Sequence, residues 1–205
     1  ENTMEAFELA AKQGADGIEL DVHVTKDGEV VVTHDEKIDR VSNGSGFIKD
    51  MTLRELKRLS FHNHMESYVG AGIPTLREVL EYVSTTNMDV NIELKTGIYW
   101  YPQIEEKTAF IVQETGMHDR VIYSSFNHHS IAKIKEIDST AETAWLFSDV
   151  ILNVEQYAKA NGVEGLHPAV YHMYMSDFMK RWNESGEKAV SYTHLRAHET
   201  RRHLV

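Results

Sequence analysis

Two carboxylates stand two positions apart in the segment GIELDVHVTKDG: Glu19 and Asp21. Ile18, Leu20 and Val22 alternate with them, which predicts a β-strand with the acidic side chains on one face. Side chains at i and i+2 lie roughly 6–7 Å apart on a strand, so their oxygens can converge on one cation. Without a cation, two enclosed carboxylates repel each other and one stays protonated. The alternative is an antiparallel strand whose polar face lies in water, and this motif alone leaves both open.

A second segment, NIELK, repeats the pattern with Glu93 and Lys95 on one face. Its surroundings predict a parallel sheet, in which a fully solvated strand face is unusual. An inward Glu beside an inward Lys indicates a third oxygen ligand and a cationic group for an anionic substrate. The alternative is a buried Glu–Lys ion pair. Three carboxylates without a thiolate or a paired histidine ligand favour Mg²⁺ or Ca²⁺ over zinc.

His34 closes the segment VVVTH. A histidine at a strand end is often a core or capping group, but beside a carboxylate site it becomes a candidate general acid or base. Its ordinary pKa near 6.5 suits proton transfer at neutral pH. We expect His62, His64, His128 and His129 to be loop or helix-start residues. His23 shares the polar face of the carboxylate strand, and His167 follows a strand and is a less favoured candidate for lining the pocket. We also expect Phe126 to be a packed aromatic residue, with a substrate contact as the alternative.

The composition is that of a soluble globular protein, with 41% hydrophobic and 26% charged residues among 205. One domain is the default at this length. The 32 acidic residues outnumber the 21 basic ones, which argues against a nucleic-acid partner. No apolar run has membrane-spanning length. The absence of cysteine excludes disulfides and thiolate chemistry. We expect a soluble protein, cytoplasmic or secreted, and the compartment stays open.

Amphipathic helical segments alternate with short aliphatic segments along most of the chain. Two segments open with the capping-box spacing Thr-x-x-Glu, at Thr52 and Thr75, and predict helix starts there. From residue 89 onward, strands and helices alternate strictly, which predicts βαβ crossovers and a parallel sheet. A doubly wound sheet and a TIM (β/α)8 barrel both fit this order. Polar inner faces favour the barrel, with Glu19 and Asp21 near its C-terminal rim.

The stretch ENTMEAFELAAKQGADGIELDVHVTKDGEVVVTHD, followed by NIELK, resembles the glycerophosphodiester phosphodiesterase family. DRVSNGSG and IPTLREVL fit the same pattern. The resemblance implies a TIM barrel that hydrolyses glycerophosphodiesters, small-molecule substrates, to an alcohol and glycerol 3-phosphate with Mg²⁺ or Ca²⁺. By position, it implies that Glu19, Asp21 and Glu93 bind the metal and Lys95 binds the phosphate. His34 would be one of two acid/base histidines.

Two features of the family pattern have no counterpart here: a first strand ending in His-Arg-Gly before Glu-Asn-Thr, and the family's last strands. A TIM barrel usually needs about 250 residues. We therefore expect residues 1–190 to form a partial barrel without its first and last strands and with a weak seventh strand. The tail 191–205, SYTHLRAHETRRHLV, is basic and rich in histidine, and we expect it to be foreign to the fold. Its histidine spacing does not match a zinc-protease motif.

Two alternatives to this function stay open. One is a related barrel that cleaves phosphatidylinositol or sphingomyelin. The other is a fragment that binds a metal or phosphate without turnover, because one of the two acid/base histidines has no counterpart.

Overall fold

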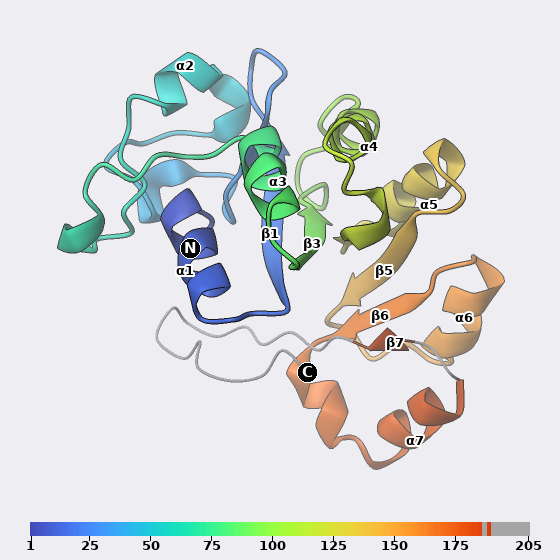
Figure 1. The fold of residues 1–205 in the computed structure, drawn as a ribbon. Coiled ribbons are helices and arrows are strands. Elements are labelled where there is room, and N and C mark those ends of the chain that lie inside the picture. The colour runs from blue at the N-terminus through green and yellow to red at the C-terminus, as the bar shows by residue number, and fades with distance from the viewer. Residues whose placement is uncertain (186–187, 190–205) are drawn as a thin grey trace.

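The computed structural model describes residues 1–185 and 188–189 (Figure 1). Its centre is one seven-stranded sheet in the order β2-β1-β3-β4-β5-β6-β7. The strands are β1 (Gly17–Val24), β2 (Val30–Val32), β3 (Asp89–Leu94), β4 (Val121–Ser125), β5 (Glu142–Phe147), β6 (Gly165–Pro168) and β7 (Lys188–Ala189). β2 pairs with β1 in the antiparallel direction, and every other pairing is parallel.

Helices alternate with the parallel strands and follow the curved sheet from α1 round to α7 (Figure 1). They are α1 (Met4–Lys12), α2 (Leu53–Leu56), α3 (Leu76–Ser84), α4 (Ile104–Glu114), α5 (His128–Ile137), α6 (Val154–Ala160) and α7 (Ser176–Ser185). Within the described residues the sheet is open, with β2 and β7 at its edges. This is the partial TIM barrel that the sequence predicts. The weak seventh strand is present as the two-residue β7.

Both predicted capping boxes are confirmed. The Thr52 hydroxyl accepts from the Glu55 amide at the start of α2, and the Glu55 carboxylate accepts from the Thr52 amide. Thr75 and Glu78 make the same reciprocal pair at the start of α3. Each box satisfies two backbone donors that have no partner within the helix. Local sequence therefore determines where these two helices begin.

Two hydrophobic cores meet at β2. The larger core lies between the sheet and the helices and includes Ile18 and Leu20 of β1. The smaller core belongs to the segment between β2 and α3 and contains Val31, Ile38, Val41, Ile48, Leu56, Phe61 and Ile73. The neighbours of Val31 on β2, Val30 and Val32, belong to the larger core. β2 thus packs against both cores, one on each of its faces.

The parallel register places the acidic residues next to one another. Asp21 pairs with Glu93, so both side chains project from the same face of adjacent strands. The same register continues to Ser124 of β4. The amide of Thr33 donates to the carbonyl of Asp21 over 3.0 Å, and this bond brings the end of β2 to the middle of β1.

Candidate active site

An acidic cluster forms where β1 and β3 lie side by side. Carboxylate oxygens of Glu19, Asp21 and Glu93 all lie within 4.8 Å of one another. Asp21 and Glu93 are buried, whereas Glu19 is accessible to solvent. Lys95 completes the group, with Nζ 3.0 Å from Glu93 Oε1 and 3.4 Å from Asp21 Oδ1. The three predicted ligands and the predicted phosphate-binding lysine therefore occupy one place.

The carboxylates of the cluster outnumber the one positively charged group, Lys95, that pairs with them. The many protein atoms around the Glu19 carboxyl group raise its pKa well above its ordinary value, and the nearby Asp21 and Glu93 raise it further, although part of the side chain reaches solvent. Burial also raises the pKa of Glu93. Burial alone would lower the pKa of Lys95, but the Glu93 and Asp21 carboxylates outweigh burial and raise it. One ammonium against three carboxylates leaves room for a divalent positive charge.

The donor atoms of the cluster fit a hard divalent cation. Asp21 Oδ2 accepts a hydrogen bond of 2.8 Å from the side-chain amide of Asn2. Asp21 Oδ1 is buried and accepts no hydrogen bond within the described part of the chain. Its charged neighbour is the Lys95 ammonium at 3.4 Å, which Glu93 shares, so this buried oxygen has an ion-pair partner and is still able to bind a cation. Carboxylate oxygens are the ligands that Mg²⁺ and Ca²⁺ prefer.

His34 is held by a second charged network. Its Nδ1 lies 2.6 Å from Asp35 Oδ1, and because an ionised carboxylate only accepts, Nδ1 carries a proton, which in the neutral ring leaves the lone pair on Nε2. Arg40 donates to both Asp35 oxygens, over 2.6 and 3.0 Å, and its terminal nitrogen also donates to Glu1. The bond to Asp35 raises the pKa of His34, and the His34 and Arg40 partners hold the pKa of Asp35 far below its usual range. The imidazole is oriented and remains half exposed.

Sequence reasoning missed the residues that hold this histidine. Asp35 directly follows His34, and Arg40 lies in the DRVSNGSG segment, which was recognised as a family feature without a role. The position of Asp35 directly after His34 was a usable signal, because an acid beside a candidate base often orients it. The Asn2 contact with Asp21 offered none, because 19 residues separate the two.

The remaining predicted positions lie in different parts of the fold. His128 begins α5 and His129 follows it, as expected, and His62 and His64 lie in the loop after α2. His167 lies inside β6, where burial lowers its pKa to about 4. Phe126 is 40% exposed, so it is not part of the buried core. The tail that begins at residue 191, with its histidines, lies outside the described residues.

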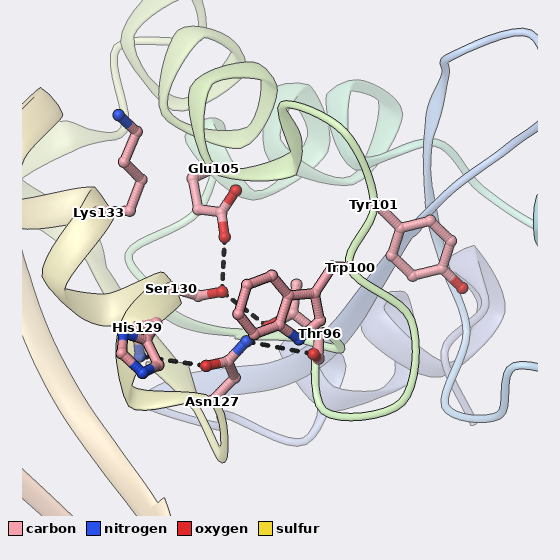
Figure 2. Close-up of a pocket in the computed structure, with 8 residues that line it drawn as sticks. All are labelled: Thr96, Trp100, Tyr101, Glu105, Asn127, His129, Ser130 and Lys133. Carbon is pink, nitrogen blue, oxygen red and sulfur yellow. Dashed lines mark hydrogen bonds between the residues drawn. The ribbon is translucent and has the colours of Figure 1, made fainter.

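A cavity of about 200 Å³ opens at the carboxyl ends of β3 and β4 (Figure 2). Its lining residues are Thr96, Trp100, Tyr101, Glu105, Asn127, His129, Ser130 and Lys133. The Ser130 hydroxyl donates to Glu105 over 2.5 Å, and the Asn127 side-chain amide donates to the Thr96 carbonyl over 3.2 Å. None of the three clustered carboxylates lines this cavity, so it is separate from the acidic cluster. Its polar contacts tie the loop after β3 to the start of α5.

Comparison with known proteins connects this geometry to a family. A sequence profile described as "Glycerophosphoryl diester phosphodiesterase family" matches residues 1–204. The chain belongs to this family. The glycerophosphodiester phosphodiesterase of Caldanaerobacter subterraneus subsp. tengcongensis is 40% identical over 194 residues, which are 94% of this chain and 79% of the relative. The enzyme of the same name from Bacillus altitudinis is 46% identical over 172 residues, covering 83% and 70%.

Solved structures of family members share the fold. A phosphodiesterase of Oleispira antarctica, in complex with the product sn-glycerol-3-phosphate, is similar with a TM-score of 0.85 and 26% identity, covering 94% of this chain and 78% of its own. The glycerophosphodiester phosphodiesterase of Agrobacterium tumefaciens gives a TM-score of 0.81 and 28% identity, covering 94% and 80%. These likenesses show that the open sheet is part of a TIM barrel of the glycerophosphoryl diester phosphodiesterase family. The family match favours this assignment over the phosphatidylinositol- and sphingomyelin-cleaving barrels.

None of the helices in residues 1–185 has the length and apolar character needed to cross a membrane.

Proposed function

We propose that this member of the glycerophosphoryl diester phosphodiesterase family hydrolyses glycerophosphodiesters to an alcohol and glycerol 3-phosphate at the acidic cluster, with a divalent cation. The observation that supports the proposal is the convergence of three carboxylates from two strands beside one lysine. An oriented histidine on the neighbouring chain segment supplies the group for proton transfer.

Glu19, Asp21 and Glu93 would hold the cation. When bound, the cation neutralises charge on a phosphate oxygen and makes phosphorus easier to attack. The Lys95 ammonium, which now pairs with Asp21 and Glu93, would bind the phosphate as a positively charged donor. Lys95 would be available for this contact when Asp21 and Glu93 hold the cation. Oxygen ligands suit both Mg²⁺ and Ca²⁺, and we propose one of these two ions.

His34 would move a proton during the displacement. Hydrolysis forms a bond from the oxygen of water to phosphorus, and this oxygen loses a proton; it breaks the bond from phosphorus to the alcohol oxygen, which gains a proton. Asp35 holds the proton on Nδ1, so the transfer passes through Nε2. Asp35 also stabilises the doubly protonated ring, because its carboxylate is close to the positive charge.

The decisive experiment is hydrolysis of glycerophosphocholine by the chelator-treated protein, followed by addition of Mg²⁺ or Ca²⁺. We expect release of glycerol 3-phosphate only when an ion is restored. Calorimetry with each ion measures binding independently of turnover. Binding without product release would support the inert metal-binding fragment, and neither binding nor release would overturn the proposal.

A further inference from the structure

His23 lies on the same strand face as Glu19 and Asp21, but both of its ring nitrogens are engaged in hydrogen bonds. Its ring is fully buried. His23 Nδ1 lies 2.9 Å from the hydroxyl of Tyr101, and Nε2 lies 3.3 Å from the backbone carbonyl of His34. The His23 and Tyr101 rings meet edge to face at 5.6 Å. A residue without an assigned role therefore joins the loop after β3 to the backbone of the candidate acid/base histidine.

The chemistry of the two partners sets the direction of these hydrogen bonds. The His34 carbonyl only accepts, so His23 Nε2 carries the ring proton and donates. Nδ1 then has a lone pair and accepts from the Tyr101 hydroxyl. One ring proton satisfies both bonds. The Tyr101 hydroxyl thus donates to His23 Nδ1, and His23 Nε2 donates to the carbonyl of His34.

Tyr101 is itself held firmly. Its ring lies 6.3 Å from that of Tyr99, which in turn lies edge to face with Phe47 at 5.9 Å. The Lys49 ammonium lies 5.2 Å from the centre of the Tyr99 ring. Phe47 belongs to the segment between β2 and α3, so this row of rings joins that segment to the loop after β3. Tyr101 also borders the cavity of Figure 2, whose hydrogen bonds anchor the same loop to α5.

We propose that Tyr101 and His23 are positioning residues for His34, acting on its backbone, while Asp35 and Arg40 orient its ring. Thr33 contributes from the other side through its amide bond to the Asp21 carbonyl. Two hydrogen bonds thus hold the backbone on both sides of the Cα atom of His34, and a small displacement there moves Nε2 relative to the acidic cluster. This inference rests on the proposed function, because it assigns His34 a role in turnover.

The test compares three variants by kcat, KM and metal affinity. Tyr101→Phe and His23→Leu each break the connection, whereas His23→Gln keeps an N–H at the position of Nε2. We expect both disrupting variants to lower kcat by on the order of tenfold to a hundredfold, with little change in KM or metal affinity, because only geometry is lost. His23→Gln should recover most of the loss. Tyr123→Phe, which removes another buried tyrosine hydroxyl, is the matched control and should keep full kcat.

A readout that does not need turnover separates this inference from the proposed function. The ring nitrogen and carbon NMR signals of His34 report its position and mobility in the metal-free protein. We expect these signals to shift or broaden in Tyr101→Phe and in His23→Leu and to return in His23→Gln. If His23→Leu does not fold, the nearly isosteric Tyr101→Phe decides. Unchanged His34 signals in folded Tyr101→Phe would overturn the positioning role, whatever the activity of the unmodified protein.

Discussion

The inner face of the sheet changes character between its first strands and its later ones. One row of paired residues runs from Asp21 on β1 through Glu93, Ser124 and Ala144 to Gly165 on β6. The residues of this row beyond Glu93 are uncharged, and the last of them, Gly165, has no side chain. A Cβ placed there would lie 2.9 Å from the Ala144 Cβ. The same backbone scaffold thus carries ionised groups on two strands and tight neutral packing on the next three.

The contrast has an electrostatic reason. Buried carboxylates spread around a barrel would each need a partner of their own, because desolvation of an isolated charge costs several kcal/mol. On adjacent strands they share one lysine, and under the proposed function they would share one divalent cation. The inner-face residues of β4–β6 then contribute by packing alone. Substitutions there should change stability more than activity. The following predictions test that division, from the largest expected effect to the smallest.

Glu93→Gln should have the largest effect. It removes a ligand charge without changing size, and we expect kcat/KM to fall by roughly 10³-fold or more, with weaker metal binding. Steady-state kinetics with glycerophosphocholine and calorimetry with Mg²⁺ or Ca²⁺ measure the two changes. Its neighbour in the same row provides the control: Ser124→Ala should change kcat/KM less than threefold. A comparable loss of kcat/KM in both variants would contradict the division between the charged strands, β1 and β3, and the neutral strands, β4–β6.

His34→Asn should lower kcat by about 10² to 10³-fold, because a positioned acid/base group contributes that much. The matched control is a second histidine–aspartate pair. His118 Nδ1 lies 3.1 Å from Asp138 Oδ2, and His118 lies just before the first residue of β4. His118→Asn should leave kcat unchanged. Equal activity in both variants would mean that His34 transfers no proton.

Asp35→Asn should have a smaller effect on the rate and a clear effect on pH dependence. Asp35 raises the pKa of His34, so its neutral replacement lowers that pKa. A base that must be unprotonated then becomes active at lower pH, and the acidic limb of the kcat/KM profile should move to lower pH. We expect kcat to fall roughly tenfold at neutral pH. An acidic limb that stays in place would assign that limb to another group.

The β4–β6 half should respond through stability. Burial lowers the pKa of His167 to about 4 in the folded protein, below its ordinary 6.5 in the unfolded chain. The unfolded state therefore binds a proton first as the pH falls, so this contribution is complete above pH 6.5 and is lost between about 6.5 and 4. The melting temperature of His167→Leu should fall less steeply over that interval than that of the unmodified protein. Parallel curves for the two proteins would contradict this assignment.

Local sequence rules predicted much of the molecule because their causes are local. The Thr-x-x-Glu boxes need only one helical turn, and both are present. Strand alternation determines which side chains share a face, so Glu19 and Asp21 had to project together. A two-residue period also placed Glu93 and Lys95 together. The exposure of Phe126 was not predictable in this way, because burial depends on what the rest of the chain places nearby.

What the sequence by itself determined is the kind of group on each strand face, the helix starts and the order of strands and helices, since these follow from backbone geometry within a few residues. Only the tertiary structure decided that Asp21 pairs with Glu93, that Arg40 holds Asp35, and that Tyr101 reaches His23 across 78 positions. Register, sheet curvature and the packing of two cores set those contacts. They are properties of the whole fold, because a shift of one residue in a strand would turn every carboxylate to the other face.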